Sequence, residues 1–224
     1  MKSSRQIIAT ILVSLYVICI LAVPVAMAAL TKTSSFDTID AWQALAAATL
    51  IEGNAEDISA SYSTIVYIEV ALTTAAAQAG CDVEIEIAYA EDDWMPFWGP
   101  VKGTAETPAT TTLNDAAATA GDTTITLTDA TTGDFDVPGR RWFIVDGTVA
   151  NSESVRTKVN ATHTVTLCWD LMRTHANSLN VWDRVDGWTV AIPMAASYVR
   201  VIINNTDADA TVHWRSYCSK VTGL

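Results

Sequence analysis

Apolar and polar residues alternate with a period of two along much of this chain, and this pattern limits the fold more than any other feature. From Val83 to Tyr89 every second residue is apolar, and Glu84 and Glu86 lie between them. The same alternation runs from Val66 to Leu72. Successive side chains of a strand point to opposite faces, so each segment predicts a strand with one buried face and one wet face. In the segment 83–89 the buried face is expected to include Tyr89.

Similar patterns and turn residues indicate many more strands. Further strands are expected at 123–127, 141–146, 152–157, 162–167, 188–192, 198–203 and 211–217. Turns are expected at Pro138-Gly139, Asp146-Gly147, Asp186-Gly187 and Asn204-Asn205. The alanine-rich segment 75–80 would join strands 66–72 and 83–89 as a long-looped hairpin.

Helix is scarce after the N-terminal leader. The candidates are 40–50, with Asp40 as a possible N-cap, and the short segment 116–120. About nine or ten strands with almost no helix predict an all-β fold, because half-wet antiparallel sheets must stack to hide their apolar faces. With half of its residues apolar, the chain has enough material for that core.

A change of composition divides the predicted strands. Segment 104–134 is rich in Thr and Ala and poor in large apolar residues, whereas the flanking strands alternate strongly. We therefore expect an antiparallel, jelly-roll-like β-sandwich made of 29–109 and 186–224. Residues 110–185 would form a small β-barrel inserted into it.

The first residues differ from the rest of the chain. Lys2 and Arg5 precede an uncharged apolar run, and Ala26-Met27-Ala28 fits the rule for signal-peptide cleavage before Ala29. Residues 1–28 are thus expected to be an apolar leader helix that is a signal peptide. A retained membrane anchor, which would make the membrane a partner, and a mis-assigned start codon are the alternatives.

Cysteine content leaves the redox state open. Outside the leader the chain has Cys81, Cys168 and Cys218. One disulfide with a free thiol and three buried reduced thiols both agree with this number, and the absence of a C-x-x-C spacing argues against a zinc or redox motif.

Charge and composition argue against several classes of function. The 13 Lys and Arg residues against 25 Asp and Glu give a net charge of -12, which disfavours nucleic-acid binding. We expect no enzyme, metal or cofactor: the acidic segments at Glu91-Asp92-Asp93 and at Asp207 and Asp209 lack calcium-loop spacing. His175 is expected to be a packed residue that donates to a backbone carbonyl, and His213 to lie opposite the core.

Aromatic residues supply the candidate interaction surface. Trp94, Phe97 and Trp98 lie close together among prolines and glycine. Such rings suit a sugar-stacking platform or a subunit contact, because they give large contact area at low entropic cost. The alternative is that they cover the junction between sandwich and insert.

The middle segment carries a family resemblance. It contains Thr-rich 123–132, the glycine turn of 134–139, 142–147 with Asp146-Gly147, the strand segments 151–156 and 162–167, and a closing Leu171 with His175. This order resembles a small β-barrel module of tailed-bacteriophage virion proteins, and 198–206 with 220–224 is similar to the sandwich half of such proteins. The resemblance implies a structural subunit without a catalytic site.

The sequence therefore predicts a non-enzymatic structural subunit of a virion or another extracellular assembly, which contacts copies of itself or a coat or capsid protein. The alternative is a secreted carbohydrate-binding module that uses Trp94 and Trp98. A secreted hydrolase with paired carboxylates is the third interpretation.

Overall fold

The computed structural model describes residues 33–74, 79–103, 107–129, 135, 137–161 and 163–223. Nearly all of its regular structure is antiparallel strand, which confirms the all-β prediction. The predicted leader, 1–28, lies outside the described residues. None of the helical structure that is described has the length and apolar character of a membrane span.

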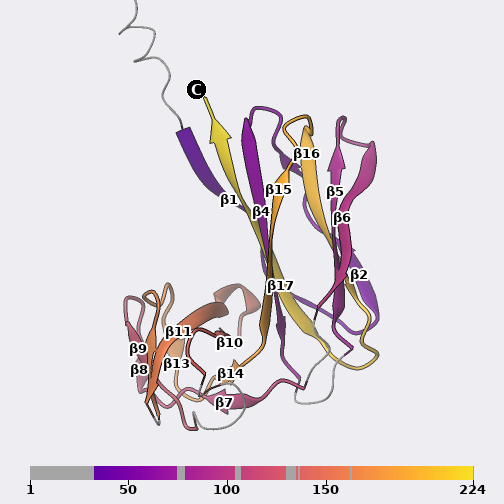
Figure 1. The fold of residues 1–224 in the computed structure, drawn as a ribbon. Helices are drawn as coiled ribbons and strands as arrows, with labels where there is room; N and C mark the ends of the chain where they lie inside the picture. Colours follow the sequence, from indigo (N-terminus) through magenta and orange to yellow (C-terminus); the bar gives the residue numbers. More distant parts are fainter. Residues whose placement is uncertain are drawn as a thin grey trace, which may run out of the picture.

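Two sheets form the sandwich (Figure 1). The four-stranded sheet has the order β1 (Thr33–Leu45), β17 (Val212–Thr222), β4 (Ser63–Leu72) and β15 (Val185–Ile192). The five-stranded sheet has the order β2 (Thr49–Glu52), β16 (Tyr198–Asn205), β5 (Cys81–Ala88) and β6 (Trp94–Lys102), and β3 (Glu56–Asp57) also pairs with β16.

The predicted alternation builds the core between these sheets. Val66, Ile68, Val70 and Leu72 of β4 are buried against Val83, Ile85 and Ile87 of β5 and their neighbours. Tyr89 was wrongly placed on the buried face: it is 51% exposed, because β5 ends at Ala88 and the period of two ends with it.

The predicted hairpin between 66–72 and 83–89 is wrong. β4 pairs with β17 and β15, whereas β5 pairs with β16 and β6 in the other sheet. Both edges of β4 are filled by strands distant in sequence, and β5 pairs with the distant β16 and with β6, the strand that follows it. The chain therefore crosses from one layer to the other between β4 and β5.

Both predicted helices are strands. β1 continues to Leu45 and β2 begins at Thr49, because pairing with β17 and burial of Ile39 and Leu45 override the helical propensity of the alanines. Asp40 is no cap: its carboxylate accepts bonds from Asn54 and Ser216. Within 116–120, β8 (Ala117–Ala118) pairs with β13 (His175–Ala176).

The remaining six strands form one closed sheet. Its order is β7 (Thr110–Thr112), β14 (Asn180–Trp182), β10 (Arg141–Ile144), β11 (Glu153–Ala161), β12 (Thr164–Leu167) and β9 (Thr124–Thr126). A bridge between Leu113 and Leu127, with backbone bonds on either side of it, joins the two outer strands into a small barrel. A separate apolar core fills it, with Phe135, Trp142 and Ile144 fully buried. Whether 110–185 folds as a separate domain stays a prediction.

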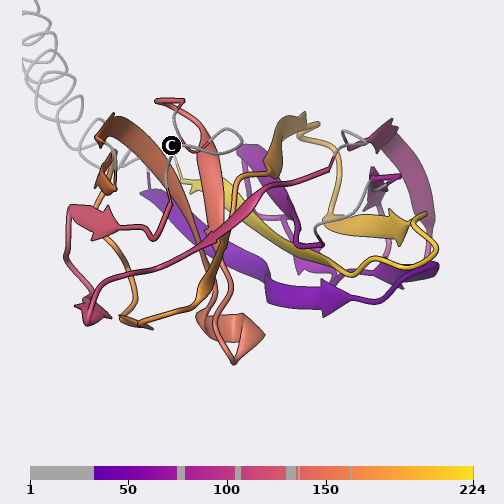
Figure 2. The ribbon, with the colours of Figure 1, turned by 90° about the horizontal axis from the view of Figure 1, so that it is seen from below.

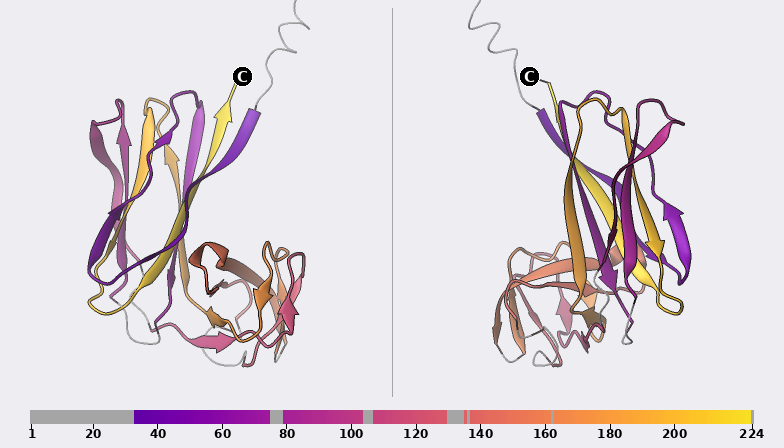
Figure 3. Two further views of the ribbon diagram at one scale, coloured as in Figure 1. Left: turned by 180° about the vertical axis from the view of Figure 1, so that it is seen from behind. Right: turned by 45° about the vertical axis from the view of Figure 1, so that its right-hand side comes forward.

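The barrel lies beside the four-stranded sheet, at the end of the sandwich away from the C-terminus (Figures 2 and 3). Phe143 points outward from the barrel and packs with Trp42 and Ala71 of the sandwich, with Val145, Val149 and Val185 around them. Val149 belongs to a short 3-10 helix, η2 (Val149–Asn151). An apolar contact therefore holds the two bodies together at this end.

The buried register of β5 predicts a sharp contrast between two neighbouring substitutions. Ile85→Asp places a carboxylate at a fully buried position and is expected to cost about 3–5 kcal/mol of unfolding free energy. Glu84→Gln, on the wet face, is expected to cost less than about 0.5 kcal/mol. Chemical denaturation measures both, and equal midpoints would contradict the register.

Candidate functional site

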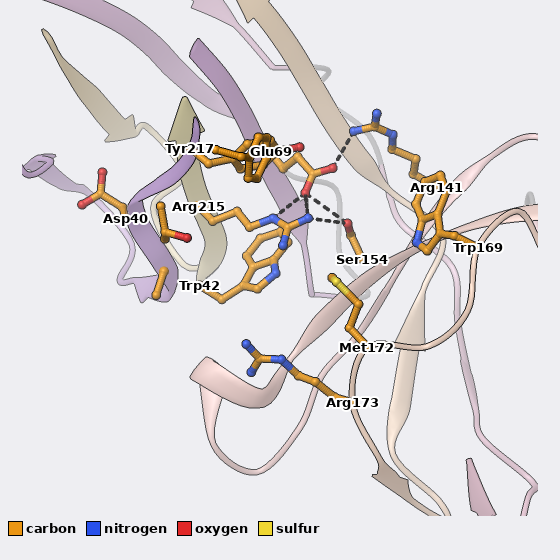
Figure 4. Close-up of a pocket in the computed structure, with 13 residues that line it drawn as sticks. Asp40, Trp42, Glu69, Arg141, Ser154, Trp169, Met172, Arg173, Arg215 and Tyr217 are labelled. Atoms are coloured by element: carbon orange, nitrogen blue, oxygen red, sulfur yellow. Dashed lines mark hydrogen bonds and ion pairs between the residues drawn. The ribbon is translucent and has the colours of Figure 1, made fainter. Parts of the chain in front are cut away.

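A cleft of about 550 Å³ separates the outer face of the four-stranded sheet from the barrel. Strands β1, β4 and β17 supply one wall, and β10, β11 and the loop after β12 supply the other (Figure 4). Most of the lining side chains from the sheet come from positions that alternate with its core positions. Glu69 and the two β17 residues thus come from wet faces that the period-two pattern predicts, whereas the lining from β1 comes from a strand that was not predicted and that includes part of the expected helix 40–50.

Glu69 of β4 lies at the centre of this cleft, with a side chain only 5% exposed. Its Oε1 accepts a bond from Arg141 of the barrel at 2.5 Å. Its Oε2 accepts bonds from Nε of Arg215 at 2.6 Å and from the hydroxyl of Ser154 at 3.0 Å. One carboxylate thus joins two strands of the sandwich to two strands of the barrel.

Gly187 makes room for this arrangement. It lies inside β15 opposite Glu69, not in the turn predicted at Asp186-Gly187. A Cβ at this position would lie 2.9 Å from Nη1 of Arg141. The missing side chain therefore lets Arg141 pass over β15 to reach Glu69.

Aromatic rings fix the second arginine. The guanidinium of Arg215 lies 4.9 Å from the ring of Trp42 and 5.3 Å from that of Tyr217, which are cation–π distances. Phe36 packs on Tyr217 with ring centroids 4.6 Å apart. Burial, together with the charge of Glu69, raises the pKa of Tyr217.

The rim of the cleft is open. Phe36 is 64% exposed, Trp169 40% and Met172 61%. The side chain of Arg141 is 38% exposed, and Arg173 is also exposed. A molecule that enters the cleft therefore meets aromatic, thioether and guanidinium groups.

His175 supports this rim without reaching it. It is fully buried and contacts Glu153 at 3.1 Å and Asp146 at 3.4 Å, so the predicted bond to a backbone carbonyl is replaced by two carboxylates. Glu153 also accepts the backbone N–H groups of Met172 and Arg173. The histidine and its partner thereby hold the loop that carries these two side chains.

The predicted aromatic surface lies elsewhere, on β6 of the five-stranded sheet. The guanidinium carbon of Arg200 lies over Trp94, 4.4 Å from the centroid of the tryptophan ring, whereas Trp98 packs against the sandwich core. Phe97 falls at a register shift of the β5–β6 pair and is 40% exposed. The three rings are spread over the edge strand, and the junction that they were alternatively expected to cover is filled by Trp42 and Phe143.

The two predicted acidic segments differ: Glu91-Asp92-Asp93 is exposed, whereas Asp207 has a structural role. Asp207 accepts the backbone N–H groups of Asp209, Ala79 and Ala210, which hold the pKa of its carboxyl below the usual range. A second cluster, Asp37 with Glu56 and Cys218, brings three potential metal ligands together. The ammonium of Lys220 bonds to both of these carboxylates and so supplies the cation there.

All three cysteines outside the leader are free thiols. Cys81 and Cys218 are buried in the sandwich, and Cys168 is exposed. Burial raises the pKa of Cys81 to about 12 and that of Cys218 to about 11, so neither is a reactive thiolate at neutral pH.

Sequence reasoning missed Glu69, Arg141, Ser154 and Arg215. A signal was present for the first: Glu69 is the sole charged residue of the apolar strand Ser63–Leu72. An acidic residue in such a strand requires a cationic partner wherever its wet face is covered. The partners themselves come from segments 72 to 146 residues away, which no local pattern reveals.

Comparison with known proteins gives a coarse result. No family model matches the chain, and a search of curated proteins found no match. Similar solved structures include a Family 16 Carbohydrate Binding Module-2 (TM-score 0.26, 10% identity, covering 81% of this chain and 74% of that one). The K1 cleaved adhesin domain of Lys-gingipain from Porphyromonas gingivalis W83 gives a TM-score of 0.32 and 11% identity, with 86% and 99% coverage.

VP17, a capsid protein of bacteriophage P23-77, gives a TM-score of 0.21 and 8% identity, covering 87% of this chain and 98% of that one. At these TM-scores the likeness extends to a β-rich architecture and to nothing finer. The resemblance to tailed-phage virion proteins is supported only at this level.

Removal of the central carboxylate is expected to destabilise the protein. Glu69→Gln leaves Arg141 and Arg215 without their counter-ion. We expect the free energy of unfolding to fall by about 2–4 kcal/mol, because breaking a buried ion pair leaves the remaining charges without a partner. Urea unfolding measures the loss, with Glu84→Gln on the other sheet as the matched control. A loss equal to that of the control would contradict the role of Glu69.

His213 predicts a pH dependence of stability. It lies opposite the sandwich core, as expected, but the barrel covers it: Phe143 is 5.3 Å away, and Thr73 bonds to Nδ1 at 3.0 Å. Burial lowers the pKa of His213 to about 4. The unfolded chain then binds a proton at higher pH than the folded chain, so stability is lost as pH falls from about 6.5 to about 4.

The measurement is the unfolding free energy at about pH 7 and about pH 4.5. The wild-type protein is expected to lose more stability between these values than His213→Gln, which cannot take up that proton. Identical losses would show that the imidazole is not shielded from solvent.

Proposed function

We propose that the protein is a non-enzymatic carbohydrate-binding module and that the cleft between sandwich and barrel is its binding site. The observation that supports this most is the combination of a fixed polar floor with an open aromatic rim. Arg215 and Ser154 are held by Glu69, while Phe36 and Trp169 are exposed beside them.

This combination matches the chemistry of a sugar ring. A pyranose has an apolar face that stacks on aromatic rings and a periphery of hydroxyl groups that pair with directional donors and acceptors. The volume of the cleft lies within the range of small-ligand sites and suits a short oligosaccharide. Because the floor is already ordered, binding would cost little conformational entropy.

The same contacts favour binding over hydrolysis. A glycosidase needs two carboxyl groups free to reach the sugar. Glu69 is occupied by two arginines and Ser154, and Asp40 is buried and bonded to Ser216 and Asn54. Both carboxylates are therefore engaged in bonds within the protein and are not free to reach a sugar. This site gives no support to the hydrolase interpretation.

A structural subunit of a virion or another extracellular assembly is the second candidate. Exposed Tyr62, Tyr89 and Met194 flank strand ends at the sandwich end remote from the barrel, where Ile192 pairs with Thr64 and Tyr198 with Ala88. A contact with another copy or with a coat protein would cover such side chains. Association with copies of itself, or with a coat or capsid protein, stays a prediction.

A glycan array followed by titration calorimetry tests the first proposal. Trp169→Ala removes an exposed ring of the cleft, and we expect at least a tenfold loss of affinity for the bound glycan, because stacked aromatic anchors dominate such sites. Trp94→Ala is the matched control on β6 and is expected to leave affinity unchanged.

If Trp94→Ala lowers the affinity and Trp169→Ala leaves it unchanged, the binding site lies on β6, at the aromatic surface that the sequence suggested. Binding to no glycan, together with large assemblies in light scattering of the same sample, would support the structural subunit instead.

A further inference from the structure

The charge exposed in the cleft is opposite in sign to that of the whole chain. The protein carries a net charge of -12, yet the carboxylate of Glu69 is almost completely buried. Asp40 is also buried, and its side chain points away from the centre of the cleft (Figure 4). The most exposed charged groups that line the cleft are the guanidinium groups of Arg141 and Arg173, and Arg215 is partly exposed beside them.

Both of these arginines retain donors for a ligand. A guanidinium carries five N–H donors, and Glu69 occupies a single nitrogen of Arg141. Arg173 makes a long contact of 3.5 Å with Asn151, while its backbone N–H is held by Glu153. The loop is thus anchored, and the guanidinium at its surface is available.

We infer that the ligand of this cleft is an acidic oligosaccharide: the carboxylate of one sugar unit binds Arg173, and the ring of another unit stacks on Trp169. Arg141 and Arg173 lie on opposite sides of the cleft (Figure 4), so a single carboxylate pairs with Arg173 and not with both. This inference rests on the proposed carbohydrate-binding function and assigns the class of sugar. Planar guanidinium groups bind carboxylates with paired hydrogen bonds, which a neutral hydroxymethyl group in the same place cannot replace.

The overall charge limits how acidic the ligand is. A densely charged polymer would be repelled by the rest of the chain, since surface potentials act over about a Debye length of 10 Å at ordinary ionic strength. A glycan with one carboxylated unit among neutral ones avoids this repulsion. The ligand is therefore a sparsely charged glycan and not a heparin-like polyanion.

The position of the cleft favours a sugar over an acidic peptide. Glu69, Arg215 and Tyr217 project from the face of the sheet, and β4 and β17 have both of their edges paired within it. An extended peptide gains most of its affinity from pairing with a free strand edge. The floor of this cleft offers side chains and rings instead.

The test compares carboxylated oligosaccharides, including sialyllactose and glucuronate-containing tetrasaccharides, with their carboxyl-reduced neutral forms. Titration calorimetry is expected to show at least tenfold tighter binding of a carboxylated form than of its reduced form. Arg173→Gln should abolish this difference and leave affinity for the neutral form unchanged. Lys102→Gln, which removes an exposed positive charge on β6, is the matched control and should preserve the difference.

Other outcomes separate the two proposals. Equal affinity for the carboxylated and reduced forms, lost in Trp169→Ala, would overturn the acidic ligand and leave the carbohydrate site standing. Tighter binding of heparin, or Arg173-dependent binding of an acidic peptide in place of any glycan, would also overturn the inference. Absence of binding to every glycan, charged or neutral, would overturn both proposals.

Discussion

The arrangement of this protein depends on one carboxylate held between two bodies. Glu69 lies on the wet face of a strand whose other face builds the sandwich core, and the barrel turns that wet position into a nearly buried one. A buried carboxylate is costly unless charged and hydrogen-bonding partners surround it. Arg215 comes from the neighbouring strand, and Arg141 and Ser154 come from the barrel, so the charge is satisfied only when the two bodies meet.

The apolar and polar contacts of the junction have separate effects. Phe143, Trp42 and Ala71 pack together at one end of the junction and exclude water there. The ion pairs at Glu69 set the orientation, since guanidinium–carboxylate bonds tolerate little misalignment. The cleft lies beside these two contacts, and the polar groups that join the two bodies form its floor.

The aromatic residues of β6 and those of the cleft differ in how accessible they are to a ligand. On β6, Trp94 is covered by Arg200, Trp98 packs against the core, and Pro96 and Pro100 remove hydrogen-bond donors from an edge strand. Proline on an edge strand protects a sheet against pairing with another chain. In the cleft, Phe36 and Trp169 are exposed beside fixed polar groups. This neighbourhood, and not the number of rings, is what favours the cleft as a binding site.

The sequence by itself determined the fold class, most strand positions and the two faces of the sandwich strands, because a period of two is a local property of the chain. The predicted helix at 40–50 was wrong, because this segment belongs largely to β1, which pairs with β17. The predicted turn at Asp186-Gly187 was also wrong, because Gly187 lies within β15 and leaves space for Arg141. Sequence reasoning also missed Glu69, although its position as the sole charged residue of an apolar strand was a local signal, and no local pattern points to its partners. Those partners are 72, 85 and 146 residues away, and only the tertiary structure brought them together, because a buried charge is neutralised by proximity in space and not by proximity in sequence.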